Sequence, residues 1–143
     1  MAKDWNYTVL LSRIDESIKQ EFYLEASWLV YAILEDRLVS ALDETGGAVT
    51  ANGKPIRMLG PKLVALEARR QETLNLRKAF FGDMLSKLDA WKEQRNELMH
   101  AMADESKEIP EIDAFAARVA ISGRELARDF CSACRRLKKF NSA

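Results

Sequence analysis

The sequence contains few residues that break helices, with six glycines and three prolines among 143 residues. None of them lies between Trp5 and Asp43, so this segment is expected to be helical almost throughout, with room for one break. No segment shows the sustained alternation of apolar and polar residues that a half-buried β-strand needs. These absences argue against sheet-based folds and predict an all-α protein.

Net charge is also absent, because 22 Lys and Arg residues balance 22 Asp and Glu residues. This balance argues against a protein that binds nucleic acid or membranes through its overall charge, although it allows a local basic cleft. The longest uninterrupted apolar run, Trp28–Leu34, is too short to span a bilayer. The N-terminal residues lack the apolar segment of a secretory signal, so we expect a cytoplasmic protein that does not bind membranes.

The chain has only two cysteines, Cys131 and Cys134, in a CxxC spacing that also occurs in redox and zinc sites. A zinc site needs about four ligands, but there is no second cysteine pair and the single histidine lies in another segment. The pair also falls inside an apparent helix from Arg124 to Lys139. We therefore interpret both residues as small, partly buried thiols and expect neither a metal ion nor a cofactor.

Where glycine and proline do occur, they separate the expected helices. A glycine-rich loop covers residues 45–60, Pro61 opens the next helix, and Pro110 opens the last one. Asp83 is the expected N-cap of the helix between them. The sequence thus predicts one domain, residues 1–143, built as an up-and-down bundle of four to five helices. In the helix that follows Pro61, the residues expected to face inward are Leu63, Leu66, Leu74 and Leu76.

The segment from Phe22 to Leu42 is apolar around nearly its whole circumference at Trp28–Leu34. A helix that is apolar on all sides is packed on several sides. We therefore expect this helix to be central, with part of its surface available for a subunit interface.

The helix expected from Met84 to Met102 contains an arginine where its pattern calls for an apolar residue. Arg95 falls in the middle of the stripe, and a buried guanidinium without a partner is costly, so it normally has a reason to be there. Its planar set of donors can hold a phosphate. His100, the only histidine of the chain, follows five residues later and can exchange a proton near neutral pH. The apolar stripe itself consists of Met84, Leu88, Trp91, Leu98 and Met102.

The spacing of these polar residues limits how they can act together. Asn96 and His100 are four residues apart and share one edge of the helix. Arg95 and His100 are about 140° apart on an ideal helix. They can meet at one spot if the arginine side chain curls round, if the helix end unwinds, or if two copies of the helix form a common groove. A two-fold dimer supplies that groove with Arg95, Asn96 and His100 of each chain.

Such a groove fits the cleavage of RNA by its own 2′-hydroxyl. This reaction needs a base for the hydroxyl, an acid for the departing 5′-oxygen, and positive charge beside the phosphate. One chain offers a single imidazole, whereas a symmetric dimer offers two, together with two arginines, and no metal ion is required. Asn96 can hydrogen-bond the phosphate or orient an imidazole.

At these residues the chain resembles the HEPN superfamily. The run Arg95-Asn96-Glu97-Leu98-Met99-His100, late in a helix of a small helical bundle, is similar to the R-x(4–6)-H signature of that superfamily. A polar residue directly after the arginine is usual there, and Asn96 fits. The resemblance implies a metal-independent endoribonuclease that acts as a homodimer, with Arg95 and His100 as the catalytic pair. It also implies a toxin or phage-defence role, in some cases with a small nucleotidyltransferase as antitoxin.

Two carboxylates, Glu35 and Asp36, follow the apolar run of the central helix and are auxiliary candidates. Asp36 can point inward, where it would pair with Arg95 or tune the pKa of His100. The alternative is a solvated break in the apolar run or a local pair with Arg37.

Other interpretations of the motif remain open. The bundle can be a non-catalytic dimeric module that binds RNA, a nucleotide or a partner protein, with Arg95 as an anion clamp. Arg95 can also bridge to a buried carboxylate and fix the dimer register, and His100 can be a polar cap. The basic end of the last helix, which includes Arg136, suits the negative end of the helix dipole or an RNA-contacting patch.

Overall fold

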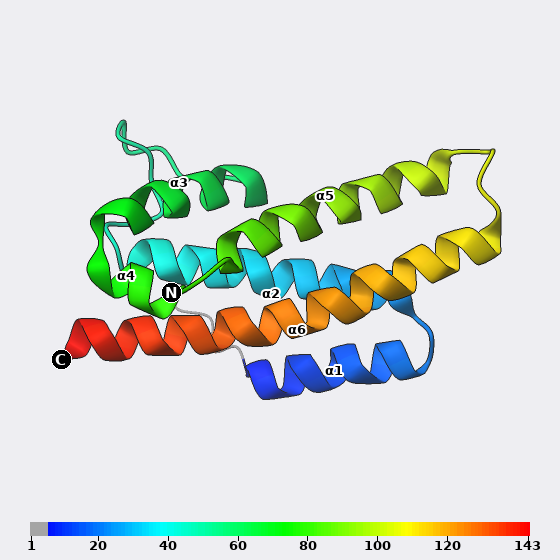
Figure 1. The fold of residues 1–143 in the computed structure, drawn as a ribbon, viewed down its shortest axis with the longest axis horizontal. Coiled ribbons are helices and arrows are strands. Elements are labelled where there is room, and N and C mark those ends of the chain that lie inside the picture. Colours follow the sequence, from blue (N-terminus) through cyan, green and yellow to red (C-terminus); the bar gives the residue numbers. More distant parts are fainter. Residues whose placement is uncertain (1–5) are drawn as a thin grey trace.

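The computed structural model describes residues 6–143 and folds them into a bundle of six α-helices (Figure 1). No strand occurs in this range, where Val49 and Pro55 form an isolated bridge. The prediction of an all-α bundle is confirmed, but the expected number of four to five helices is too low. The helices are α1 (Tyr7–Lys19), α2 (Tyr23–Asp43), α3 (Leu59–Glu72), α4 (Leu74–Ala79), α5 (Met84–Ala103) and α6 (Ile109–Ser142).

Two helices form the centre of the bundle. The 34-residue α6 packs along α2, α1 packs against both, and α5 lies against α6 on the opposite side (Figure 1). The core is built mainly from leucine and alanine, and it includes Phe80 and Phe130, whose rings meet edge to face at 5.5 Å. None of the helices in residues 6–143 is long and apolar enough to cross a membrane.

The break expected between Trp5 and Asp43 lies at Glu21, although Trp5 itself falls outside the described residues. Glu21 has a φ of 62°, the left-handed conformation that ends many helices. The amide of Phe22 donates to the carbonyl of Ser17 at 2.7 Å, and the amide of Glu21 donates to that of Ile18 at 3.0 Å. These two bonds satisfy the last carbonyls of α1 and turn the chain into α2 without glycine.

The extra helix arises at Thr73, whose extended backbone separates α3 from α4. The phase of the helix starts again there, so Leu76 is buried whereas Leu74 is 54% exposed. The prediction that Leu74 faces inward is therefore wrong. Asp83 precedes α5 as predicted, but its side chain makes no capping hydrogen bond.

Arginines tie down two helix ends. Arg69 of α3 donates to the carbonyls of Leu42 at 2.8 Å and Gly47 at 2.6 Å, which closes the C-terminal end of α2. Arg136 of α6 donates to the carbonyl of Ala79 at 2.7 Å. The cation predicted to serve the end of its own helix, or an RNA surface, is thus engaged with the end of α4.

Gly123 of α6 lies where this helix packs closely against α5 and α2. A Cβ atom there would lie 2.6 Å from Nε1 of Trp91 and 2.8 Å from Cγ1 of Val30. Trp91 is buried, and its indole nitrogen donates to the carbonyl of Val119 at 2.9 Å. Because Trp91 lies one turn before Arg95, this contact fixes the part of α5 that presents the arginine.

Candidate functional site

Arg95 lies half-buried on α5, with its guanidinium carbon 4.1 Å from the centre of the Tyr31 ring on α2. This is a cation–π contact. Its Nε atom is buried and has no hydrogen-bond partner within the described part of the chain. None of the ion pairs among residues 6–143 involves Arg95. The bridge to a buried carboxylate is therefore not formed within the described chain, and the guanidinium remains available to an anion.

Arg95 lines a groove of about 350 Å³ between α2 and α5. Trp28, on the α2 side, is 73% exposed. Val30 and Leu34 are fully buried, as expected for a helix that is packed on several sides, whereas Trp28 leaves part of the apolar run open to solvent. The groove is lined by Leu24, Glu25 and Trp28 from α2 and by Arg95, Met99 and Met102 from α5.

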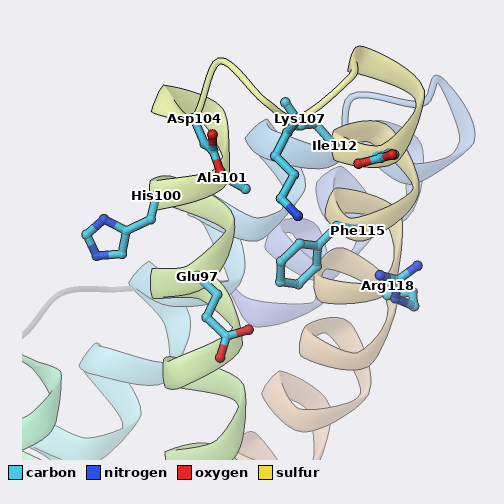
Figure 2. Close-up of a pocket in the computed structure, with 9 residues that line it drawn as sticks. Glu97, His100, Ala101, Asp104, Lys107, Ile112, Phe115 and Arg118 are labelled. Atoms are coloured by element: carbon cyan, nitrogen blue, oxygen red, sulfur yellow. The ribbon is translucent and has the colours of Figure 1, made fainter.

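His100 is exposed in the last turn of α5 and lies at the edge of a second hollow, of about 440 Å³. Lys107 and Phe115 also line this hollow, which lies between the C-terminal end of α5 and the start of α6. The imidazole points away from these two side chains (Figure 2). Arg95 and His100 therefore line different hollows of one helix, and Asn96 is exposed on the surface between them. A single chain does not bring the three groups to one point.

Neither auxiliary carboxylate makes a hydrogen bond or ion pair with Arg95 or His100 among the described residues. Glu35 accepts a hydrogen bond at 2.6 Å from Nζ of Lys62, a buried residue of α3. Asp36 accepts from the hydroxyl of Tyr7 and, at 2.8 Å, from Arg37. The local pair with Arg37 is thus the alternative that the structure forms, rather than the pair with Arg95. Both carboxylates join helices instead of lining the groove.

The two cysteines are free and buried. The thiol of Cys134 donates to the carbonyl of Arg37 at 3.2 Å. Burial raises the pKa of Cys134 to about 12 and raises the pKa of Cys131 as well. Burial and the bond to Asp36 also raise the pKa of Tyr7. At neutral pH these thiols are protonated and poorly nucleophilic, in keeping with the predicted buried pair.

The described residues contain no group of three or more His, Cys, Asp or Glu side chains placed to hold a metal ion. Of the two groups that the sequence singled out, Arg95 lines the groove and His100 lines the other hollow. Sequence reasoning identified both groups but missed the exposed indole of Trp28 and the support of Arg95 by Tyr31. The one sign of the exposed indole in the sequence was that α2 is apolar around nearly its whole circumference at Trp28–Leu34, which is more apolar surface than one core needs.

The chain matches no protein-family model, and the searches of curated proteins and of solved structures gave no match.

Proposed function

We propose that the protein is a metal-independent endoribonuclease of the HEPN type that acts as a homodimer. In this proposal Arg95 and His100 are the catalytic residues and Asn96 is the supporting polar residue. The observation that carries this proposal is the environment of the Arg95 guanidinium. Its guanidinium rests on Tyr31 without an acidic partner among residues 6–143, one and a half turns before the only histidine of the chain.

The exposed face of α5 suggests how two chains would meet. Asn96 and His100 lie roughly 100° and 140° round the helix from Arg95 and face solvent. Pairing of this face with the same face of a second copy would bring two imidazoles to one seam and leave an arginine beside it. A two-fold arrangement also explains how one histidine per chain can provide both an acid and a base.

The reaction needs no group beyond these side chains. One neutral imidazole takes the proton of the 2′-hydroxyl, and the oxygen attacks the adjacent phosphorus. The other imidazole, in its protonated form, gives a proton to the departing 5′-oxygen. Arg95 stabilises the negative charge that gathers on the phosphate oxygens. The products are a 2′,3′-cyclic phosphate and a 5′-hydroxyl.

The biological setting forms part of the same proposal. A ribonuclease of this kind would act in the cytoplasm as a toxin or defence protein, restrained by an antitoxin such as a small nucleotidyltransferase. A partner that covers the α5 surface around His100 would block the proposed seam.

The test is cleavage of single-stranded RNA in the presence of EDTA. The parent protein should yield 2′,3′-cyclic phosphate ends, and His100→Ala and Arg95→Ala should each abolish cleavage while their melting temperatures stay within a few degrees of the parent. Gln94→Ala is the matched control, since Gln94 is exposed on the same helix but lines neither hollow described above. Equal cleavage by the parent and both variants would show that these residues are not catalytic.

A second candidate is the non-catalytic module, which the 73% exposure of Trp28 beside Arg95 favours. In that case the parent would leave RNA intact, while a bound oligonucleotide, nucleotide or protein raises the melting temperature. This rise would disappear in Arg95→Ala.

A further inference from the structure

The groove between α2 and α5 combines an exposed indole with a guanidinium that has no acidic partner among the described residues, and folded proteins seldom leave either group in this state. Trp28 is 73% exposed, the most exposed aromatic side chain among the described large hydrophobic residues. Across the groove, Arg95 has no hydrogen bond or ion pair among residues 6–143, and Tyr31 supports its guanidinium from below. An apolar plane and an unpaired cation therefore face one cavity of about 350 Å³.

These two groups match the two parts of an unpaired nucleotide. An exposed aromatic plane stacks with the face of a base, and a guanidinium binds the phosphate. A base within a duplex cannot reach the indole, because both its faces are already stacked on neighbouring bases. The groove thus suits a single strand.

Glu25 sets the direction in which such a nucleotide would lie. Glu25 lines the groove on the α2 side, one turn before Trp28, and its carboxylate makes no ion pair among the described residues. Its charge repels a phosphate, and it can accept hydrogen bonds from N–H groups on the edge of a base. The base therefore belongs on the α2 side and the phosphate on the α5 side, where Met99 and Met102 provide an adaptable apolar wall.

We propose that this groove is a nucleotide subsite for single-stranded RNA, in which Trp28 stacks on an unpaired base while Arg95 holds the adjoining phosphate. The inference rests on the proposed ribonuclease function for the identity of the strand. It adds Trp28 as the residue that selects an unpaired nucleotide, and it leaves the proton transfers to His100.

The test measures binding of a fluorescent five-nucleotide 2′-O-methyl RNA by anisotropy. This probe has no free 2′-hydroxyl, so the parent protein can bind it without cutting it. Trp28→Ala should weaken binding about tenfold or more, whereas Trp28→Phe, which keeps an aromatic plane, should weaken it by less than about threefold. Phe22→Ala is the matched control, because Phe22 is an exposed aromatic residue of the same region that does not line the groove. It should bind as the parent does.

A second probe carries abasic residues at all five positions. Trp28→Ala and the parent should bind this probe equally, because no base is left to stack. Loss of binding to the base-containing RNA by Trp28→Ala, without cleavage of ordinary RNA by the parent, supports the subsite and refutes the ribonuclease. Cleavage by Trp28→Ala with the KM of the parent, or equal binding of the base-containing RNA by both, refutes the subsite. Dissociation of a dimer by Trp28→Ala with unchanged RNA affinity also refutes it, because a second copy then occupies the groove.

Discussion

Gly123→Ala is the substitution whose effect the structure defines most sharply. The new Cβ would lie 2.6 Å from Nε1 of Trp91, 2.8 Å from Cγ1 of Val30 and 2.9 Å from Cε2 of Trp91, all closer than real Cβ contacts. Neither neighbour can withdraw easily. Trp91 is 3% exposed and hydrogen-bonded to Val119, and Val30 is fully buried. The helices must therefore separate, or the indole must give up its bond.

Two destabilising effects and one stabilising effect determine the change in the free energy of unfolding. Overpacking of a core costs about 1–3 kcal/mol, and a weakened indole hydrogen bond costs about 1 kcal/mol more. Alanine gains about 1 kcal/mol over glycine within a helix. Because the new Cβ clashes with two buried residues, we expect Gly123→Ala to lower the free energy of unfolding by about 2–3 kcal/mol.

Urea unfolding of the variant measures this value, and a double-mutant cycle with Trp91→Phe identifies its cause. Phenylalanine lacks the nearest atom, so Gly123→Ala should cost less in the Trp91→Phe background than in the parent. An increase of stability by about 1 kcal/mol, as expected at an open helical position, would refute the reasoning that this glycine lets α2, α5 and α6 meet.

Two further predictions concern stability outside the site. Glu21→Gly should raise the free energy of unfolding by about 0.5–1 kcal/mol in urea melts, because glycine relieves the positive φ of 62° that ends α1; Glu21→Ala should give no such gain, and equal effects of both changes would contradict the strain. Cys134 has a pKa of about 12 when folded against 9.0 as its ordinary value, so its contribution is complete below pH 9 and declines as pH rises toward 12. The stability difference between the parent and Cys134→Ala should therefore change in favour of the variant between pH 8 and pH 10, and a constant difference would refute the assigned burial of the thiol.

Much of the fold could be predicted because glycine and proline mark most of the helix ends. The stop before Asp83 and the start near Pro110 agree with α5 and α6. The break at Thr73 was missed because no glycine or proline accompanies it, and the change of helical phase that exposes Leu74 is visible only in three dimensions. The role of Gly123 was missed for a similar reason, since it depends on residues of two other helices.

The site was predictable only in part. The interruption of an apolar stripe singled out Arg95, and the angle between it and His100 correctly indicated that they diverge within one chain. The partners of Asp36 could not be chosen from sequence, because the helical register allows both an inward and a local contact. The structure forms the contacts with Tyr7 and Arg37. The exposure of Trp28 depends on how α5 lies beside α2, which periodicity along one helix does not reveal.

The most direct test of the central claim is the activity of mixed dimers. Parent and His100→Ala chains are mixed in varying ratios, allowed to exchange subunits, and assayed for RNA cleavage in EDTA. If one scissile phosphate needs an imidazole from each chain, activity follows the square of the parent fraction, and an equal mixture retains about a quarter of the parent rate. A linear decline, with about half of the rate retained, would show that each chain works alone and would contradict the account.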